Sequence, residues 1–279
     1  MNRPFQLVDV FNDGALTGNP LAVVFDADDL TSSAMQNLTR WLNLSETAFL
    51  LRPTSPKADY RVRIFTLERE LPFAGHPTLG TCHAWLSQGV ESVGAGEIIQ
   101  ECEAGLVTIR RAADRLSFLA PPIIRGGSVD EPTLAKIAAF LRINRSQIAD
   151  AQWADNGPGW VVVMLASADA VLAVEPVRDY PVRMDVGVVG PYPTGSSVAF
   201  ELRAFFTDHH GAVREDPVTG SLNASTAQWL LSSGRARAHY IAAQGARVGR
   251  SGRIFIDQDE RGVWVGGQTT TLFAGTYFA

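Results

Sequence analysis

The sequence contains few cysteines and no long apolar run. Cys82 and Cys102 are the only cysteines among 279 residues, and they form neither a C-x-x-C pair nor a metal-ligand pattern. Nothing in this pattern indicates a disulfide framework, and we predict that both cysteines are small buried apolar residues. No stretch approaches about eighteen apolar residues, and the N-terminal segment does not resemble a signal peptide. We therefore expect a soluble, cytoplasmic protein with no membrane partner.

Common nucleotide-binding and hydrolase motifs are also missing. No G-x-G-x-x-G opens a helix after a strand, and no G-x-S-x-G elbow is present. Gly75 and Gly80 have the glycine spacing of a phosphate-binding loop, but Thr81 and Cys82 stand where lysine and a serine or threonine are required. Dinucleotide binding, phosphate-loop chemistry and serine hydrolysis therefore have no support.

Lysine is scarce, and the balance of charge is mildly acidic. Lys57 and Lys136 are the only lysines among 24 basic residues, and the formal net charge is −5. No window is rich in lysine and arginine together, so we expect no nucleic-acid partner. His209 and His210 are adjacent, which places no third ligand at a suitable spacing, and we assign no metal.

One motif occurs twice, once in each half of the chain. The first copy has an aromatic strand at 63–66, a glycine-containing polar turn at 71–78 and an apolar segment ending at Gly89. The second copy has the same parts at 203–207 and 215–221, and it ends at Gly234. A repeat of this kind predicts two like domains related by a pseudo-twofold axis.

The pattern of elements predicts an α+β fold in which each domain is a curved, mostly antiparallel sheet wrapped around a central helix. The helices predicted at 78–86 and 222–231 are apolar on most sides, which indicates burial. The proline- and glycine-rich segment 120–128 predicts a linker. We place the domains at 1–120 and 128–279, allow the last strand to return to the first domain, and expect the active site between them.

An amphipathic helix is predicted before the first motif copy. It begins at a cap in 31–33, ends at Asn43, and packs on a sheet through the four apolar residues Met35, Leu38, Trp41 and Leu42.

The helix starts in the repeated turns offer unpaired backbone N–H groups, which suit a small anion such as a substrate carboxylate. Thr219, Ser221 and Asp216 can equally be ordinary caps. Glu46, at a junction between a helix and an apolar strand, is either a partly buried acid suited to proton transfer or an exposed loop acid. His76 can donate to a ligand or serve the structure alone.

Together these segments resemble the PhzF-like family of phenazine-biosynthesis isomerases, which has the diaminopimelate epimerase-like fold. The resemblance covers nearly the whole chain, and its motifs are long and ordered. Its segments are 17–20, 43–47, 63–66, 70–81, 156–158, 215–221, 244–245 and 249–250. One departure is Leu222-Asn223, where the family usually continues with small residues, and we expect the bulkier side chain to reshape the pocket.

The resemblance implies a site with no metal or organic cofactor, in a homodimer that acts on a small anionic carboxylate substrate. The implied catalytic residues are Glu46, His76 and Asp216, and the implied substrate-binding residues are Asn19, Ser45, Gly75, Gly220 and Ser221. Related epimerases and proline racemases use two thiols, or a thiol and a hydroxyl, as acid and base. Here Ala74-Gly75-His76 precedes the helix and Cys82 lies too far along it, so we expect one carboxylate to carry the proton.

The expected activity is isomerisation of a small carboxylate-bearing metabolite through Glu46. Two alternatives stay open. The first is an epimerase or racemase of an amino or imino acid, which would share the fold and the carboxylate clamp. The second is a non-catalytic homologue that binds a metabolite.

Overall fold

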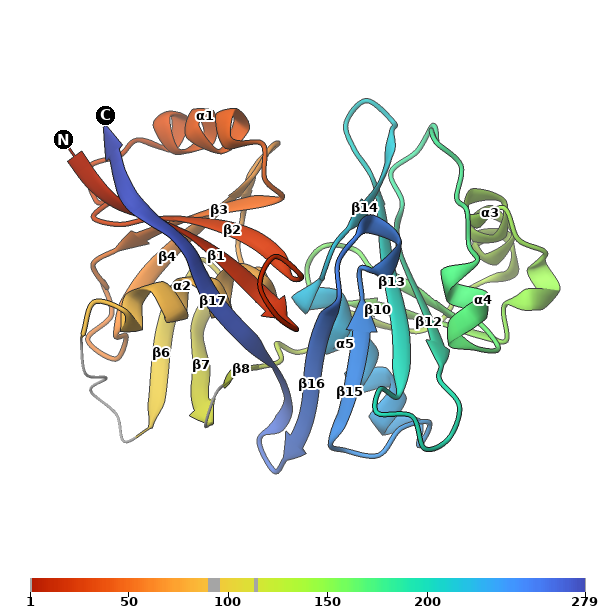
Figure 1. The fold of residues 1–279 in the computed structure, drawn as a ribbon. Coiled ribbons are helices and arrows are strands. Elements are labelled where there is room, and N and C mark those ends of the chain that lie inside the picture. The colour runs from red at the N-terminus through yellow and green to blue at the C-terminus, as the bar shows by residue number, and fades with distance from the viewer. Residues whose placement is uncertain (1, 90–95, 113–114, 279) are drawn as a thin grey trace. The chain divides into compact units, whose positions relative to one another are not determined.

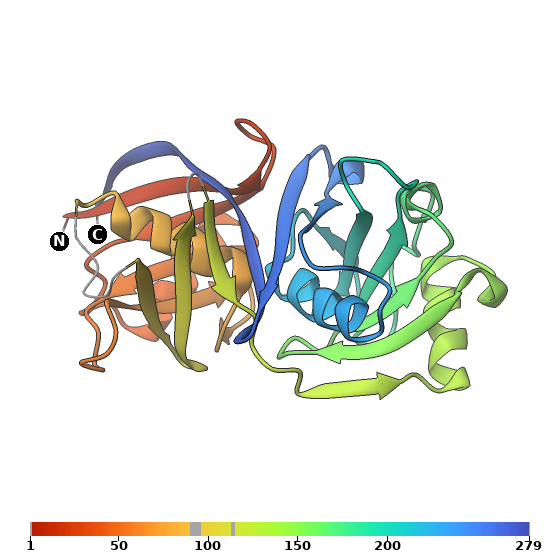
Figure 2. The ribbon, with the colours of Figure 1, turned by 90° about the horizontal axis from the view of Figure 1, so that it is seen from below.

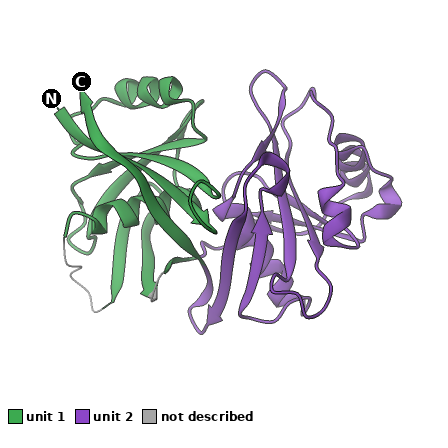
Figure 3. Ribbon diagram, in the orientation of Figure 1, with its two compact units in different colours: residues 1–119, 266–279 green, residues 120–265 purple. Residues whose placement is uncertain are grey.

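The computed structural model describes residues 2–89, 96–112 and 115–278. Positions 1, 90–95, 113–114 and 279 lie outside this description. They include residue 1, the first of the first predicted domain, and residue 279, the last of the second. The chain divides into two compact units, shown in Figure 3. Unit 1 comprises Met1–Leu119 and Gly266–Ala279, and unit 2 comprises Ala120–Val265. The final strand thus begins in unit 2 and ends in unit 1.

Unit 1 is a closed sheet around one helix (Figures 1 and 2). Its strands are β1 (Asn2–Asn12), β2 (Asn19–Val24), β3 (Glu46–Leu51), β4 (Tyr60–Thr66), β5 (Glu70–Leu71), β6 (Glu97–Cys102), β7 (Gly105–Ala112), β8 (Arg115–Leu119) and the later part of β17 (Gly262–Phe278). Neighbouring strands pair in the order β17, β1, β2, β3, β4, β6, β7, β8, and β8 pairs with β17 to close the ring. Helix α2 (Gly75–Leu86) contacts strands on several sides of this ring.

Unit 2 has a matching succession of strands around α5 (Gly220–Ser232), which Figure 2 shows among its strands. Its strands are β9 (Arg125–Ser128), β10 (Asp150–Asp155), β11 (Val161–Met164), β12 (Asp185–Pro191), β13 (Phe200–Thr207), β14 (Val213–Asp216), β15 (Tyr240–Gln244), β16 (Gly252–Asp259) and the start of β17. They pair in the order β9, β10, β11, β12, β13, β15, β16, β17, with β14 on β13.

The two units share one pattern of strand directions. In unit 1, β2 runs parallel to β3 and β4 parallel to β6, while β1–β17, β1–β2, β3–β4, β6–β7 and β7–β8 are antiparallel. In unit 2 the same places are taken by the parallel pairs β11–β12 and β13–β15. The predicted α+β fold, with a mostly antiparallel sheet around a central helix in each half, is confirmed.

The central helices are buried because they are apolar on most sides. Gly80 of α2 lies where a side chain would not fit. A Cβ added there would lie 2.5 Å from Leu21 Cδ2 and 2.9 Å from Val10 Cγ2. The missing side chain lets α2 approach β1 and β2 closely. Cys82 is buried in the same helix and Cys102 in β6, as predicted, and burial raises the pKa of the Cys82 thiol to about 12.

The helices outside the sheets are α1 (Ser32–Leu42), α3 (Glu131–Leu141), α4 (Ala168–Leu172) and the 3₁₀ turns η1 (Arg145–Gln147) and η2 (Ala246–Val248). Helix α1 begins and ends as predicted, with a Thr31 cap and Asn43 in the left-handed conformation at φ 55°. Met35 and Leu38 pack on the sheet, but Trp41 is 80% exposed, so its predicted place on the buried face is wrong. Thr39 is buried instead, because it lies closer to Met35 around a helix that turns by about 100° per residue.

The predicted linker at 120–128 is partly wrong, because its last residues form strand β9. Gly126 and Gly127 pair with Ala154 and Trp153 of β10. All four residues of β9 are exposed. An exposed edge strand that contains two glycines has no apolar alternation, so its sequence does not distinguish it from a loop.

Candidate active site

Three of the proposed site residues meet in unit 1. Asn19 and Glu46 are the first residues of β2 and β3, two neighbouring parallel strands, and His76 is the second residue of α2. His76 Nε2 lies 3.5 Å from Glu46 Oε2, and His76 Nδ1 lies 3.5 Å from Asn19 Nδ2. The parallel strands bring their first residues to the same end of the sheet, against the start of the central helix.

Both Glu46 and His76 are largely shielded from solvent, and this burial keeps the His76 ring neutral. The Glu46 side chain is 16% exposed, which agrees with a largely buried acid and not with an exposed loop acid. His76 is buried, and desolvation lowers its pKa from 6.5 to about 3, so the imidazole is neutral near pH 7. A neutral ring carries one hydrogen, and its Nε2 side faces the Glu46 carboxylate across 3.5 Å.

A buried aspartate shapes the turn that leads to Asn19. The Asp9 carboxylate accepts the backbone N–H of Thr17 at 3.1 Å and that of Gly18 at 2.9 Å. A Cβ at Gly18 would lie 2.2 Å from the Val10 carbonyl oxygen, so only glycine fits there. These contacts set the position from which the Asn19 amide reaches His76.

The starts of α2 and α5 differ from those of the other α-helices in the described ranges. The N-cap side chains of α1, α3 and α4, which are Thr31, Asp130 and Ser167, each accept a hydrogen bond from a backbone N–H. Ala74 and Thr219, at the N-caps of α2 and α5, make no side-chain cap bond. The interpretation of Thr219 as an ordinary cap is therefore wrong, because its hydroxyl points to another partner. Both helix starts keep backbone donors and partial positive charge available to an anion.

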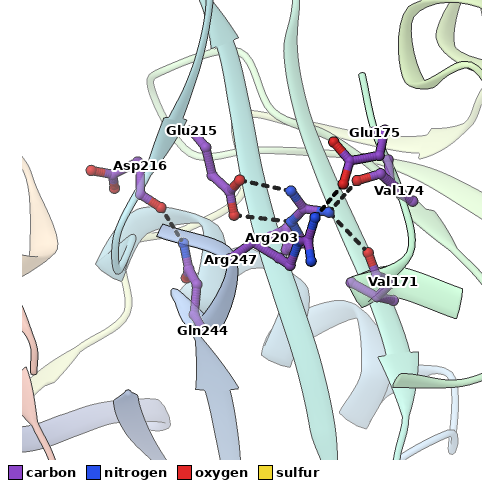
Figure 4. A network of polar contacts seen from close by, with 8 residues as sticks. All are labelled: Val171, Val174, Glu175, Arg203, Glu215, Asp216, Gln244 and Arg247. Atoms are coloured by element: carbon purple, nitrogen blue, oxygen red, sulfur yellow. Dashed lines mark hydrogen bonds and ion pairs between the residues drawn. The ribbon is translucent and has the colours of Figure 1, made fainter. Parts of the chain in front are cut away.

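In unit 2 the turn before α5 is held by Gln244 (Figure 4). The Gln244 amide donates to the Asp216 carbonyl at 3.1 Å. It also donates to Thr219 Oγ1 at 2.9 Å, and the Asp216 carboxylate accepts the Thr219 hydroxyl at 2.5 Å. Gln244 Oε1 accepts the Thr219 N–H at 3.0 Å and the Asn223 amide at 2.8 Å. One buried amide thus fixes both ends of the turn.

Ser221 is held by two residues of a neighbouring segment. Its hydroxyl oxygen accepts the indole N–H of Trp160 at 3.0 Å, and its carbonyl accepts the Asn156 amide at 2.9 Å. Because an acceptor site of the hydroxyl is occupied, its own hydrogen is available for donation. Gly220, beside it, is the first residue of α5 and is buried.

The eight proposed residues therefore fall into two sets. Unit 1 holds Asn19, Ser45, Glu46, Gly75 and His76, and unit 2 holds Asp216, Gly220 and Ser221. The supporting residues Gln244, Asn156 and Trp160 were not identified as such from the sequence. Gln244 and Asn156 do lie in segments of the family resemblance, and this membership is the feature of the sequence that could have identified them. The segment 244–250 forms the hairpin connection between β15 and β16.

Each copy of the repeated motif also contains an arginine–glutamate pair. Arg63 Nε donates to Glu70 Oε1 at 2.7 Å in unit 1, and Arg203 Nε donates to Glu215 Oε1 at 2.9 Å in unit 2. Arg203 also donates to the carbonyls of Val171 and Val174, as Figure 4 shows. The pairs connect each motif strand with the short strand that leads to the turn. The structure thus gives the arginine of each motif strand a structural role.

Leu222, the departure from the family pattern, is fully buried inside unit 2. A Cβ added at Gly187 would lie 2.4 Å from Leu222 Cδ1 and 3.2 Å from Val162 Cγ2. Because Gly187 has no side chain, the Leu222 side chain fits beside it in the interior of unit 2.

We expect Gly187→Ala to destabilise the protein by about 1–3 kcal/mol, because the added methyl group overlaps Leu222. In Gly187→Ala/Leu222→Ala the overlap is removed, so the free energy of unfolding should fall by less than the sum of the two single changes. Urea unfolding of the four proteins measures this coupling. Additive effects would contradict the packing argument.

The neutral His76 predicts a specific pH dependence of stability. As the pH falls below about 6.5, the unfolded chain takes up a proton on His76, whereas the folded chain does so only near pH 3. Stability is therefore lost as the pH falls through this window. In His76→Gln the slope of unfolding free energy against pH should be smaller by up to about 1.4 kcal/mol per pH unit between roughly pH 6 and 4.

Denaturant unfolding at pH 7, 6, 5 and 4 tests this expectation. His210→Gln, which changes an exposed histidine, is the control and should keep the wild-type slope. An unchanged slope in His76→Gln would show that His76 is not held neutral.

Within residues 2–89, 96–112 and 115–278, no group of three or more histidine, cysteine, aspartate and glutamate side chains is arranged to hold a metal ion. In the same part of the chain, no helix is long and apolar enough to cross a membrane.

Comparisons with known proteins give consistent matches over nearly the full length. The family model described as phenazine biosynthesis-like protein matches residues 8–275. The chain is 36% identical over 298 residues to antisense-enhancing sequence 1 of Schizosaccharomyces pombe, covering 98% of both chains. It is 31% identical over 288 residues to trans-2,3-dihydro-3-hydroxyanthranilate isomerase of Pseudomonas fluorescens, again covering 98% of both. A PhzF-family crystal structure from Enterococcus faecalis superimposes with a TM-score of 0.81 at 25% identity and covers 100% of both chains.

Proposed function

The chain belongs to the phenazine biosynthesis-like protein family, PhzC-PhzF, and from this premise we propose that it is a cofactor-independent isomerase of a small carboxylate-bearing metabolite. The isomerase class follows from the family. The proton path is our own proposal. Glu46 removes a proton from a carbon next to an unsaturated or carboxylate-bearing centre and returns it to another position of the same molecule.

The observation that carries the proposal is the contact between Glu46 and His76 at the uncapped start of α2. A largely buried carboxylate beside a neutral imidazole can accept a proton without a competing positive charge next to it. When the C–H bond breaks, its electron pair delocalises into the substrate and the proton forms an O–H bond on Glu46. The neutral His76 ring, 3.5 Å from the carboxylate, keeps Glu46 in position through both proton transfers in this proposal.

The helix starts supply the binding part of the proposal. The backbone N–H groups of Gly75 and His76 open α2, and those of Gly220 and Ser221 open α5. Such groups favour a carboxylate, at roughly 0.3–1 kcal/mol from the helix dipole alone. We propose that Asp216 and the Ser221 hydroxyl hold polar groups of the same substrate that Glu46 deprotonates. That this site lies between the domains of a cytoplasmic homodimer stays a prediction.

The relative from Pseudomonas fluorescens is named for trans-2,3-dihydro-3-hydroxyanthranilate, which makes this compound the first probe. The test is nuclear magnetic resonance of the protein with this compound, and then with a panel of small unsaturated carboxylates, in deuterium oxide containing a metal chelator. A shifted double bond with deuterium incorporated would support the proposal. Activity that the chelator abolishes would contradict cofactor independence.

The same experiment separates the alternatives. Deuterium at a stereocentre, with inversion of configuration in an amino or imino acid, would identify an epimerase or racemase. Saturable binding without exchange across the panel would identify a protein that binds a metabolite without converting it.

A further inference from the structure

A second concave site lies entirely in unit 2. It has a volume of about 480 Å³ and is formed by the segment that follows β12, the strands β13 and β15, and the hairpin around η2. Glu201 lies in its wall next to Ala243, its partner in the parallel β13–β15 pair. The volume is within the usual range of small-ligand pockets. None of the eight residues proposed for the active site lines it.

Only one oxygen of the buried Glu201 carboxylate accepts a hydrogen bond within the part of the chain that the structure describes. Glu201 is 1% exposed, and the Tyr192 hydroxyl donates to its Oε2 at 2.8 Å. Among the described residues, its Oε1 has no hydrogen-bond partner. A buried carboxylate oxygen without a donor costs free energy, which a ligand donor would recover.

The repeat shows that the fold does not need an acid at this place. Arg203 and Arg63 occupy equivalent positions of β13 and β4, since each pairs with the glutamate of its own short strand. Two residues earlier, unit 2 has Glu201 where unit 1 has Arg61. The buried acid at this place is therefore particular to unit 2.

Positively charged side chains also line the pocket. Arg250 and Arg253 line the pocket, together with the hydroxyl-bearing Ser196, Ser197 and Ser251. Guanidinium groups and hydroxyls are suitable partners for a carboxylate. Among the residues that line the pocket, Glu201 is thus an acceptor suited to a cation, and the arginines and serines are donors suited to an anion.

We propose that this pocket binds a small zwitterion of the amino-acid class. Its ammonium group donates to Glu201 Oε1, and its carboxylate is bound by Arg250 and Arg253. A simple amine can pair only with the Glu201 carboxylate, and a simple carboxylate can pair only with the two arginines. Each of these ligands therefore makes only part of the contacts that a zwitterion makes.

The proposal predicts that the affinity for the zwitterion depends on pH. Burial raises the pKa of Glu201 to about 7, while the Tyr192 hydroxyl and the charges of Arg253 and Arg203 oppose the rise and Glu215 adds to it. An ammonium group favours the ionised carboxylate, so binding near neutral pH releases the proton of Glu201. The affinity should therefore rise roughly tenfold between pH 6 and pH 8.

Calorimetric titration of the full chain with L-alanine, L-serine and L-leucine at pH 6 and pH 8 tests the proposal, with propylamine and propionate as single-charge probes. We expect saturable binding of at least one amino acid, tighter than of either single-charge probe and tighter at pH 8. Binding of no amino acid, or equal binding of propylamine, would overturn the proposal.

Two variants identify the binding place. Glu201→Gln keeps the shape of the side chain and should weaken amino-acid binding at least tenfold at pH 8 and remove its pH dependence. Arg250→Gln changes a residue at the edge of the pocket and should weaken amino-acid binding but not propylamine binding. Undiminished amino-acid binding in both variants, with the fold verified by circular dichroism, would refute the assignment.

Glu46→Gln is the matched control, because it changes the proposed active site in unit 1. It should leave amino-acid binding at the pocket unchanged, whether or not the isomerase proposal is correct. Loss of amino-acid binding in Glu46→Gln alone would place the ligand at the active site and contradict the second site.

Discussion

Glu46→Gln is expected to lower turnover by on the order of 10²- to 10⁴-fold, which is the usual contribution of a general acid–base group. The amide cannot take up the substrate proton, yet it keeps the size of the side chain and can still contact His76. Substrate binding should therefore change little, so the loss should appear in kcat and not in KM. Solvent-deuterium incorporation, measured with the substrate that the panel identifies, follows proton abstraction directly.

Glu68→Gln is the control for this variant, because Glu68 is an exposed acid of the same unit. It should keep wild-type turnover. Near-wild-type turnover in Glu46→Gln would refute the assignment of Glu46 as the group that carries the proton. A loss of deuterium exchange together with a loss of binding would instead indicate that Glu46 holds the substrate.

Glu215→Ala is expected to lower the free energy of unfolding by about 3–5 kcal/mol, because it leaves the buried Arg203 charge without its partner. The side chains of Arg203 and Glu215 are 4% and 11% exposed, and two hydrogen bonds join them. The Val171 and Val174 carbonyls still accept from Arg203, but they carry no negative charge. Urea unfolding, followed by circular dichroism and tryptophan fluorescence, measures the change.

The repeat provides the matched control. Arg63 and Glu70 form the equivalent pair in unit 1, but their side chains are 20% and 28% exposed. Water can solvate the remaining arginine there, so Glu70→Ala should cost clearly less. Arg203→Met/Glu215→Leu, which removes both charges, should recover much of the stability lost in Glu215→Ala. Equal effects of Glu70→Ala and Glu215→Ala would show that burial does not govern the strength of the pair.

Much of the fold was predictable because the repeated motif carries strong local signals. The aromatic strands, the glycine-containing turns and the all-round apolar helices indicated one plan in both halves, and the strand pairing bears this out. Exposed or irregular parts were predicted less well. Trp41 is solvent-exposed although it was assigned to the packed face, and β9 lies in the segment assigned to a linker. Apolarity alone does not determine which side of a helix is covered, and an exposed glycine strand has no apolar pattern.

The candidate site was predictable only in part. Glu46 and His76 were singled out one by one, but the sequence left open whether Glu46 is buried and whether His76 does more than support the structure. Their 3.5 Å contact exists because β3 starts at Glu46 beside the start of α2, and these positions are 30 residues apart. The role of Gln244 in holding the turn was not foreseen, because its partners Asp216 and Thr219 come from another segment.

The family, the α+β class, the repeat and the buried character of both central helices can be inferred from local composition, from spacing and from the order of motifs. Which groups meet becomes visible only in the folded chain. Examples are the acid beside a neutral histidine, the two helix starts without side-chain caps, and the buried Glu201, whose second oxygen lacks a hydrogen bond within the described residues. Burial and charge pairing depend on neighbours that are distant in the chain, and folding alone brings those neighbours together.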